Sequence, residues 1–370
     1  MPEGLFKAIL SALSPKLTLG NTILDKIGRN EDTFNVLTEI QTQLLKFVSR
    51  YKHAMIEGSA GTGKTVLAVK KARQLAMEGN KVLLLCYNNL LGAGLKEAVA
   101  DLKEYIEASN YHDFCIQCLL KSKFKDEIDY KKPGFWDVII PELMQKYIAE
   151  YPLNYDAVII DEGQDFKEDY WFSLLDEFKE EKYFYVFYDP RQNIFHTKMS
   201  FPEEMIPFTL NRVCRNTSAI FEYMQKYSET ESELFEGMPL GDDVHEFILL
   251  DDNERNRTLG KILKNLIHEQ QIEPDNIVVL GGHGFKNSIL KSNCKYSDIV
   301  VIDPSDDSYT QKDSSNEKNV KYYTYMKFKG CESDIVILLD VDKNDPRWDD
   351  NGIYTAASRA KTLLYVIRKN

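Results

Sequence analysis

The apolar residues of the chain gather in short continuous runs, which alternate with longer stretches where apolar residues recur every three or four positions. A short continuous run is typical of a strand buried on both faces, and the wider spacing is typical of a helix with one buried face. This pattern predicts strands at 54–56, 81–87, 157–160 and 182–188, and helices at 66–75 and 90–105. Strands that alternate with helices predict an α/β fold with mostly parallel sheets.

A second set of strands is predicted in the C-terminal half, at 247–250, 277–280, 299–302, 335–339 and 363–367, with a helix at 259–268. Residues 199–208 separate the two sets and carry two prolines, which are typical of a connecting segment. The polar segments 121–136 and 305–320 are predicted to be loops. We therefore expect an N-terminal lead-in at 1–36, a first domain at 37–202 and a second domain at 203–370.

Residues 37–49 predict a further amphipathic helix, for which Thr38 is the expected N-cap. Gln41 follows three residues later, as in a capping box, where the two side chains bond each other's backbone N–H groups. The side-chain amide of Gln41 also both donates and accepts, so it can instead read the edge of an adenine. The local pattern alone favours the capping role.

Composition narrows the class of protein. The chain has 370 residues, of which 43% are hydrophobic, yet no apolar run approaches the roughly 20 residues that cross a membrane. We expect a cytoplasmic protein without membrane contact, whose 6 cysteines are reduced thiols. Cys115 and Cys118 form a lone C-x-x-C pair in apolar surroundings, which favours core packing over zinc. The net charge of −12 argues against indiscriminate coating of DNA and leaves room for a local groove that binds nucleic acid.

A phosphate-binding loop follows the first predicted strand and precedes a predicted helix. The loop reads Gly58, Ser59, Ala60, Gly61, Thr62, Gly63, Lys64 and Thr65, which fits the pattern G-x-x-x-x-G-K-[ST]. Its glycines let backbone N–H groups surround phosphate oxygens at the positive end of a helix. The Lys64 side chain is expected to reach the β- and γ-phosphates, and the Thr65 hydroxyl is expected to bind Mg²⁺.

Carboxylates and amides follow the later strands of the same half. Asp161 and Glu162 end the strand at 157–160, and ligands bind at this end of the strands in open α/β sheets. Asp161 suits a Mg²⁺ ligand, and Glu162 suits a base that activates water. Gln192 follows the next strand, where an amide can orient water against the γ-phosphate. His112, at the head of a predicted apolar helix, is either a structural histidine or a phosphate contact.

Taken together, these motifs resemble those of the UvrD/Rep-like superfamily 1 helicases, in the family's order, over roughly residues 38–368. The matches to the family's ATP site are Gln41, the loop from Gly58 to Thr65, Asp161-Glu162-Gly163-Gln164-Asp165, Gln192, Arg215, Glu332 and Arg359. The matches to its strand-contacting segments are Tyr87, Asn88, Tyr111, His112, Phe195, Thr324 and Lys329. The residues of several motifs are most similar to those of the helicase-like module that is found with nuclease-related domains.

The resemblance implies two RecA-like P-loop NTPase lobes, each a mostly parallel sheet flanked by helices, with ATP and Mg²⁺ in the cleft between them. Its implied catalytic residues are Lys64, Glu162, Gln192, Arg215 and Arg359. Gln41 and Glu332 are implied to bind the nucleotide together with the loop, and Thr65 and Asp161 are implied to hold Mg²⁺. The strand-contacting segments are implied to bind single-stranded nucleic acid.

The chain departs from the family in ways that bear on function. Cys214 stands where an aromatic residue usually stacks on adenine, and Thr197 stands where the family often has a tryptophan. Met326 replaces a usual histidine, and Phe195 occupies the place of one base-stacking aromatic. The spacing of the motifs leaves little room for the family's two large accessory domains. The resemblance therefore implies a bare two-lobe motor.

Three functions remain in competition at this level. The first is an ATP-driven translocase or helicase on single-stranded DNA, which we expect ahead of the others. The second is a similar motor that acts on RNA or on an RNA–DNA hybrid. The third is an ATP-gated interaction module in a larger complex, with a nuclease among its candidate partners. The excess of acidic over basic residues favours the third function. The presence of the family's catalytic residues favours the first two.

Overall fold

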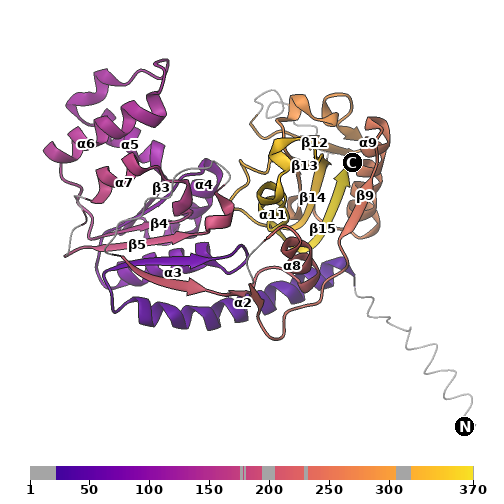
Figure 1. Cartoon of the computed structure of the whole chain (residues 1–370), viewed down its shortest axis with the longest axis horizontal. Coiled ribbons are helices and arrows are strands. Elements are labelled where there is room, and N and C mark those ends of the chain that lie inside the picture. Colours follow the sequence, from indigo (N-terminus) through magenta and orange to yellow (C-terminus); the bar gives the residue numbers. More distant parts are fainter. Residues whose placement is uncertain are drawn as a thin grey trace, which may run out of the picture.

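The computed structural model describes residues 22–175, 178, 181–193, 205–228, 232–305 and 318–369. Within these residues the chain forms two lobes, each built on a sheet (Figure 1). The first sheet has six parallel strands in the order β3-β2-β4-β5-β1-β6. Its strands are β1 His53–Gly58, β2 Val82–Cys86, β3 Ile106–Asn110, β4 Ala157–Ile160, β5 Tyr183–Tyr188 and β6 Ile206–Leu210. Its helices are α3 Lys64–Met77, α4 Asn89–Ala98, α5 Tyr111–Leu120, α6 Ile140–Glu150 and α7 Glu168–Leu175.

The second sheet has seven strands in the order β11-β12-β13-β10-β14-β15-β9, and all its pairs are parallel except β11 with β12. The strands are β9 His245–Ile248, β10 Ile277–Gly281, β11 Lys295–Tyr296, β12 Ile299–Ile302, β13 Lys318–Thr324, β14 Ser333–Val341 and β15 Ala360–Arg368. The helices are α8 Ser218–Gln225, α9 Asp252–Lys264 and α11 Asp350–Ala357. A short pair, β7 Arg212–Val213 with β8 Glu233–Leu234, lies between the lobes in sequence. The α/β architecture with mostly parallel sheets is therefore as predicted.

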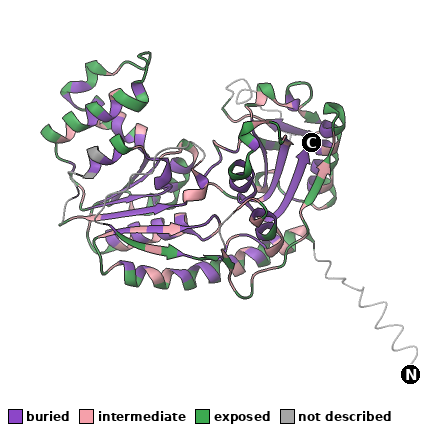
Figure 2. Cartoon of the chain, in the orientation of Figure 1, coloured by how far each residue is buried: buried purple, intermediate pink, exposed green. Residues whose placement is uncertain are grey.

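Each sheet is buried on both faces, as the continuous apolar runs predict. Strands β2, β4 and β10 are buried at every position, and Figure 2 shows buried strands in both lobes between more exposed helices. In the first lobe, one apolar cluster contains Leu67 and Leu84, and another contains Leu83 and Phe166. Successive residues of one strand thus face opposite layers of helices. Cys115 lies in the second of these clusters as a free thiol, which confirms its predicted role in core packing.

Helix α2, Ile23–Val48, is longer than predicted and contacts both lobes. Its N-terminal part packs into the second lobe through Ile27, and its C-terminal part packs into the first lobe through Val48. Figure 1 shows this helix running beneath both lobes. The expected lead-in at 1–36 therefore includes a helical segment that joins the two lobes.

The prediction that Thr38 caps a helix is wrong. The cap is Thr22, whose hydroxyl accepts a hydrogen bond from the backbone N–H of Asp25 at 3.1 Å. Thr38 lies in the middle of the helix and its hydroxyl donates to the carbonyl of Phe34 at 2.7 Å. The buried face of α2 includes polar residues such as Asn30, so the helix lacks the apolar periodicity that would have marked its first half.

Two further differences concern the ends of the lobes. Strand β6 pairs with β1, so the first sheet extends to Leu210, beyond the expected domain boundary after residue 202. Strand β13 begins at Lys318, inside the segment predicted to be a loop, and β3 at Ile106–Asn110 was not predicted. Among the described residues, no helix is long and apolar enough to cross a membrane. The same residues contain no cluster of histidine, cysteine and acidic side chains that could hold a metal ion.

Candidate nucleotide site and interlobe groove

The phosphate loop joins β1 to α3 in the conformation that its glycines allow. Gly61 and Gly63 have positive φ angles of 73° and 79°. A Cβ atom on Gly61 would lie 1.8 Å from the side-chain oxygen of Asn216, which belongs to the segment entering the second lobe. The backbone N–H of Cys214 also donates to the Gly61 carbonyl at 2.8 Å. The loop is therefore held on one side by the strand of its own lobe and on the other by the second lobe.

The side chain of Lys64 folds back against the phosphate loop. Its ammonium donates to the carbonyls of Gly58 and Ser59, at 2.9 and 3.1 Å, and lies 3.7 Å from the carboxylate of Asp189. The side chain is only 6% exposed. A positive charge in this position faces the space enclosed by the loop, where phosphate oxygens bind in P-loop proteins.

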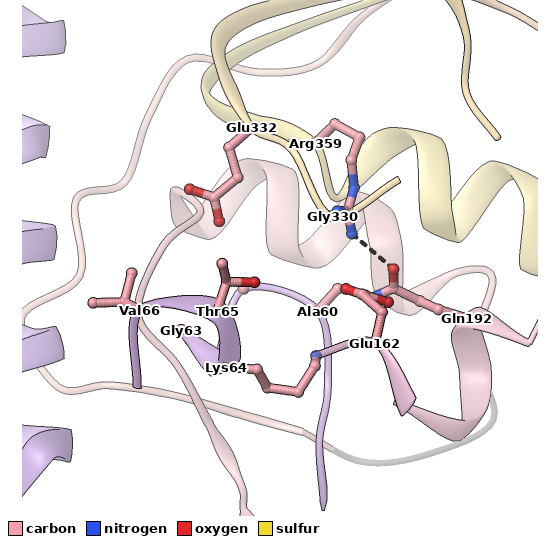
Figure 3. Close-up of a pocket in the computed structure, with 11 residues that line it drawn as sticks. Ala60, Gly63, Lys64, Thr65, Val66, Glu162, Gln192, Gly330, Glu332 and Arg359 are labelled. Carbon is pink, nitrogen blue, oxygen red and sulfur yellow. Dashed lines mark hydrogen bonds between the residues drawn. The ribbon is translucent and has the colours of Figure 1, made fainter. Parts of the chain in front are cut away.

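Asp161 is the side chain that best fits a Mg²⁺ ligand. It lies at the carboxyl end of β4, is fully buried, and neither carboxylate oxygen has a hydrogen-bond partner among the described residues. Burial, together with the neighbouring charge of Glu162, raises the pKa of Asp161 to about 7. A buried carboxylate without a partner is costly unless a cation binds it, and carboxylate oxygens are the ligands that Mg²⁺ prefers. Thr65, the other expected ligand, lines the cavity beside the phosphate loop (Figure 3).

Glu162 is held in a strained backbone conformation, with φ of 57° in a residue that is not glycine. Burial acts to raise its pKa, but the charges of Lys329, Lys64 and Arg359 bring that pKa below its ordinary value. The side-chain N–H of Gln164 also donates to the Glu162 carboxylate at 2.5 Å. Glu162 is therefore ionised at neutral pH, which is the state that a base requires.

Arginines from the second lobe complete the site. Arg359 donates to the side-chain oxygen of Gln192 at 2.9 Å, across the boundary between the lobes (Figure 3). Gln192 in turn donates to Asp189 at 2.9 Å. Arg215 pairs with Glu332 at 2.8 Å, and the carboxylate of Glu332 raises the pKa of Arg215. The structure therefore brings Gln192, Glu332 and Arg359 to one cavity, and Arg215 is connected to it through Glu332.

These groups surround a cavity of about 150 Å³. Its lining comes from both lobes: Ala60, Gly61, Gly63, Lys64, Thr65, Val66, Glu162, Gln192, Gly330, Glu332 and Arg359. Gln41 lies next to it, 3.5 Å from the position of a Cβ on Gly63. The Gln41 amide donates to the carbonyl of Arg212 at 2.7 Å and accepts from the thiol of Cys214 at 3.2 Å. Its proposed contact with adenine stays a prediction.

Two contacts near this site were missed by the sequence analysis, one between the lobes and one within the second lobe. The hydroxyl of Tyr354 accepts a hydrogen bond from the backbone N–H of Ala60 at 3.0 Å. The Asn216 side chain donates to the carbonyls of Ser358 and Ala360, at 3.1 and 2.6 Å. Both residues lie within motifs that the sequence analysis identified by their arginines. Proximity to those arginines was the only signal in the sequence that could have revealed them.

A larger cavity of about 640 Å³ lies between the lobes on another side. It is lined by Tyr87, Asn88, Asn89, Leu90, Ala93, His112, Asp165, Pro304, Ser305, Tyr323, Met326, Lys327 and Lys329. We call this cavity the interlobe groove. It contains several of the residues expected to contact nucleic acid, from both lobes. Asn88 spans the groove by donating to the carbonyls of Met326 and Lys327, at 3.3 and 2.9 Å.

Other residues expected at the strand-binding surface take different positions. Tyr111 is fully buried and stacks on Tyr170 at 4.5 Å, which places it beneath the groove surface. Thr324 ends β13, and its hydroxyl accepts from the backbone N–H of Lys327 at 3.3 Å. Phe195 lies outside the described residues.

Lys329 connects the groove with the nucleotide site. It is 1% exposed, pairs with Asp165, and lies 3.6 Å from the carboxylate of Glu162. Because the same residue lines the groove, a change at either site can alter the charge environment of the other.

Comparisons with known proteins gave the following similarities. Residues 41–198 match the model of a protein family described as an AAA domain. Among solved structures, the chain is similar to an arterivirus nonstructural protein 10 (helicase) with DNA, at 13% identity and a TM-score of 0.41. It is also similar to the PRRSV helicase, at 10% identity and a TM-score of 0.42. Each similarity covers 85% of this chain but only 60% and 52% of those two chains, respectively. No curated protein matches the chain.

The family match therefore lies within the first lobe of an α/β fold that has two mostly parallel sheets.

Proposed function

We propose that the chain is an ATP-dependent motor that moves on single-stranded DNA. The observation that carries the proposal is the contact between Arg359 of the second lobe and Gln192 of the first, at the mouth of the phosphate loop. An arginine that reaches the nucleotide only when the lobes are together makes hydrolysis depend on lobe closure. Groups of this kind contribute about 10³–10⁵ to the rate of phosphoryl transfer where they act on the γ-phosphate.

Each residue of the site has a distinct task in this mechanism. Lys64 binds the β- and γ-phosphates, and the backbone N–H groups of the loop surround them. Asp161 and Thr65 would hold Mg²⁺, which neutralises the charge that develops on the phosphate oxygens. Glu162 takes a proton from the attacking water, and Gln192 orients that water. Arg359 and Arg215 stabilise the negative charge of the transition state.

Movement requires the nucleotide site to communicate with the strand. The interlobe groove and the nucleotide cavity both take residues from the two lobes, so relative motion of the lobes reshapes both. Lys329 belongs to the groove and pairs with acids of the nucleotide site, which offers a direct link. Each cycle of ATP binding and hydrolysis would in this way switch the lobes between two arrangements and shift the groove along a strand.

The test is a steady-state ATPase measurement without nucleic acid and with single-stranded DNA, duplex DNA and single-stranded RNA, at equal nucleotide concentration. The proposal expects the largest stimulation with single-stranded DNA. Preferential stimulation by RNA would support the RNA-directed motor instead. A basal ATPase that none of the polymers changes would contradict any motor.

A second candidate is an ATP-gated interaction module within a larger complex, with a nuclease as one candidate partner. Two observations favour it: the chain has a net charge of −12, and Lys329 in the groove is already neutralised by Asp165. Such a module would bind ATP, close its lobes and present a changed surface to a partner. Polymer-independent ATP binding with little turnover would favour this candidate over the motor.

A further inference from the structure

An aromatic and basic segment stands beside the interlobe groove and has no role in the nucleotide site. It runs from Tyr130 through Lys131 and Lys132 to Trp136, where a short helical turn, Phe135–Ile139, begins at Phe135. Trp136 is 41% exposed and Tyr130 is 57% exposed. The two other tryptophans of the chain, Trp171 and Trp348, are each only 2% exposed. A large aromatic surface left open to water in this way is typical of a binding surface.

Trp136 is connected to the groove by a chain of ring contacts. Its ring lies 5.1 Å from that of His112, at an angle of 74°. The His112 ring lies 5.3 Å from that of Tyr87, at 65°. Both His112 and Tyr87 line the interlobe groove, so the exposed indole extends the groove wall outward. Tyr130 continues the surface, with its ring 5.8 Å from that of Trp136.

Two lysines beside these rings are available, while the neighbouring Asp137 carboxylate is paired with Lys167. Lys131 and Lys132 are exposed, and neither has an ion-pair partner in the part of the chain that the structure describes. Asp129 instead accepts a hydrogen bond from the backbone N–H of Lys131, at 3.1 Å. Two free ammonium groups next to two exposed rings form the combination that holds single strands, because cations meet phosphates and rings stack on bases.

We infer that Trp136 and Tyr130 form a base-stacking platform, and that Lys131 and Lys132 bind the adjacent phosphates, of a single strand that leaves the interlobe groove. The occupant is single-stranded nucleic acid, and stacking makes the platform tolerant of base sequence. This inference rests on the proposed function and adds a second binding element outside the motifs of the nucleotide site.

Tryptophan fluorescence tests the platform directly, because Trp136 is the exposed indole among three tryptophans. An unlabelled oligothymidylate is titrated into the full chain while binding is followed independently by the anisotropy of a dye-labelled copy. We expect quenching that saturates together with binding, and we expect Trp136→Ala to abolish the quenching. Binding without any quenching would overturn the inference and leave the proposed function intact.

The affinity of variants for single strands provides a second test of the platform. Trp136→Ala is expected to weaken binding about 5- to 150-fold, the range for loss of one base stack, and Trp136→Phe is expected to retain most of the affinity. Lys131→Ala with Lys132→Ala is expected to reduce the slope of log affinity against log salt by about 1.4, or 0.7 for each phosphate contact. Tyr105→Ala, which removes another exposed aromatic of the first lobe, is the matched control.

Failure of the platform can be distinguished from failure of the proposed function. Unchanged affinity in the Trp136→Ala and lysine variants, with normal stimulation of ATPase by single strands, would overturn the platform alone. Absence of both binding and ATPase stimulation in the unmodified chain would overturn the proposed function and, with it, this inference.

Discussion

The hydroxyl of Tyr354 in the second lobe accepts a hydrogen bond from the backbone N–H of Ala60 in the phosphate loop, at 3.0 Å. Tyr354 lies on α11, shortly before Arg359, and Ala60 packs into the apolar cluster of the second lobe. The Arg191 guanidinium lies 5.7 Å from the centre of the Tyr354 ring. The conformation of the loop and the position of Arg359, the proposed catalytic arginine, are therefore linked through one short helix.

Replacing Tyr354 with phenylalanine should separate these two elements without removing the ring. The loss of one hydrogen bond at a buried amide corresponds to about 0.5–1.5 kcal/mol, which predicts a fall in kcat of about 2- to 12-fold. The KM for ATP should change less than kcat, because the hydroxyl acts on the placement of Arg359. Steady-state kinetics measure both constants. Tyr325→Phe removes a hydroxyl that bonds to Arg347 within the second lobe, at 2.6 Å, and is expected to leave kcat unchanged.

Glu162→Gln should leave ATP binding largely intact and slow hydrolysis by roughly 10²–10⁴, the contribution of a positioned general base. The substitution keeps the size of the side chain and removes only the charge that accepts a proton. Single-turnover hydrolysis and binding of a fluorescent ATP analogue measure the two effects separately. Turnover close to that of the unmodified chain would remove Glu162 from the mechanism.

Arg359→Ala should reduce hydrolysis by about 10³ or more while nucleotide affinity changes far less, because the guanidinium meets charge that develops in the transition state. Arg215→Ala should act in the same direction, with a small added loss of stability because its ion pair with the partly exposed Glu332 is removed. Thermal unfolding distinguishes the two variants. Arg347→Ala, a half-exposed arginine of the same lobe, serves as the control. Equal losses of affinity and no change in maximal rate would identify both as ordinary binding residues.

The raised pKa of Asp161 predicts that its replacement by asparagine stabilises the fold and removes activity. Because burial raises this pKa from 3.8 to about 7, the unfolded chain releases the proton first, and the folded chain loses stability as pH rises between those values. Asp161→Asn removes that loss, so its melting temperature without nucleotide should exceed that of the unmodified chain by a margin that grows from pH 4 to pH 7. The same variant should lose Mg²⁺-dependent ATPase activity. A melting-temperature difference that does not change with pH would contradict the assignment.

The elements that the sequence predicted well share a simple physical basis. Strands β2, β4 and β14 are continuous apolar runs because helices cover both of their faces. The phosphate loop was recognisable because few residues other than glycine fit its backbone geometry. The close approach of Asn216 to Gly61 illustrates this. Residues required by a local backbone shape or a two-sided core therefore leave a readable pattern.

The features that were missed depend on contacts between distant segments. Helix α2 has polar residues on its buried face because it contacts both lobes, with Asn30 donating to Thr362 at 3.3 Å and Glu31 accepting from Lys361 at 2.7 Å. The burial of Lys329 against Asp165 likewise arises only when the lobes meet. No local period along the chain encodes such partners.

The last prediction concerns strand separation by the isolated chain. Residues between His112 and Asp161 form helices of the first lobe, and the described residues between Arg215 and Thr324 belong to the second lobe, so neither region provides a large accessory domain. A motor that separates strands requires a firm grip on one strand and a surface that opens the duplex. Here the net charge is −12 and the grip depends on a narrow groove, so affinity should fall by about 0.7 log units per phosphate contact for each tenfold rise in salt.

We therefore expect single strands to stimulate the ATPase while unwinding of a long duplex by the isolated chain stays poor, because binding is weak and easily lost between steps. The measurement is ATP-dependent displacement of a labelled strand from duplexes of increasing length, with the Glu162→Gln variant as the control for hydrolysis. Displacement that falls steeply with duplex length, and recovers when a partner protein is added, fits a motor that obtains its processivity from a complex. Efficient displacement of long strands by the purified monomer would show that the two lobes suffice as a free-standing helicase.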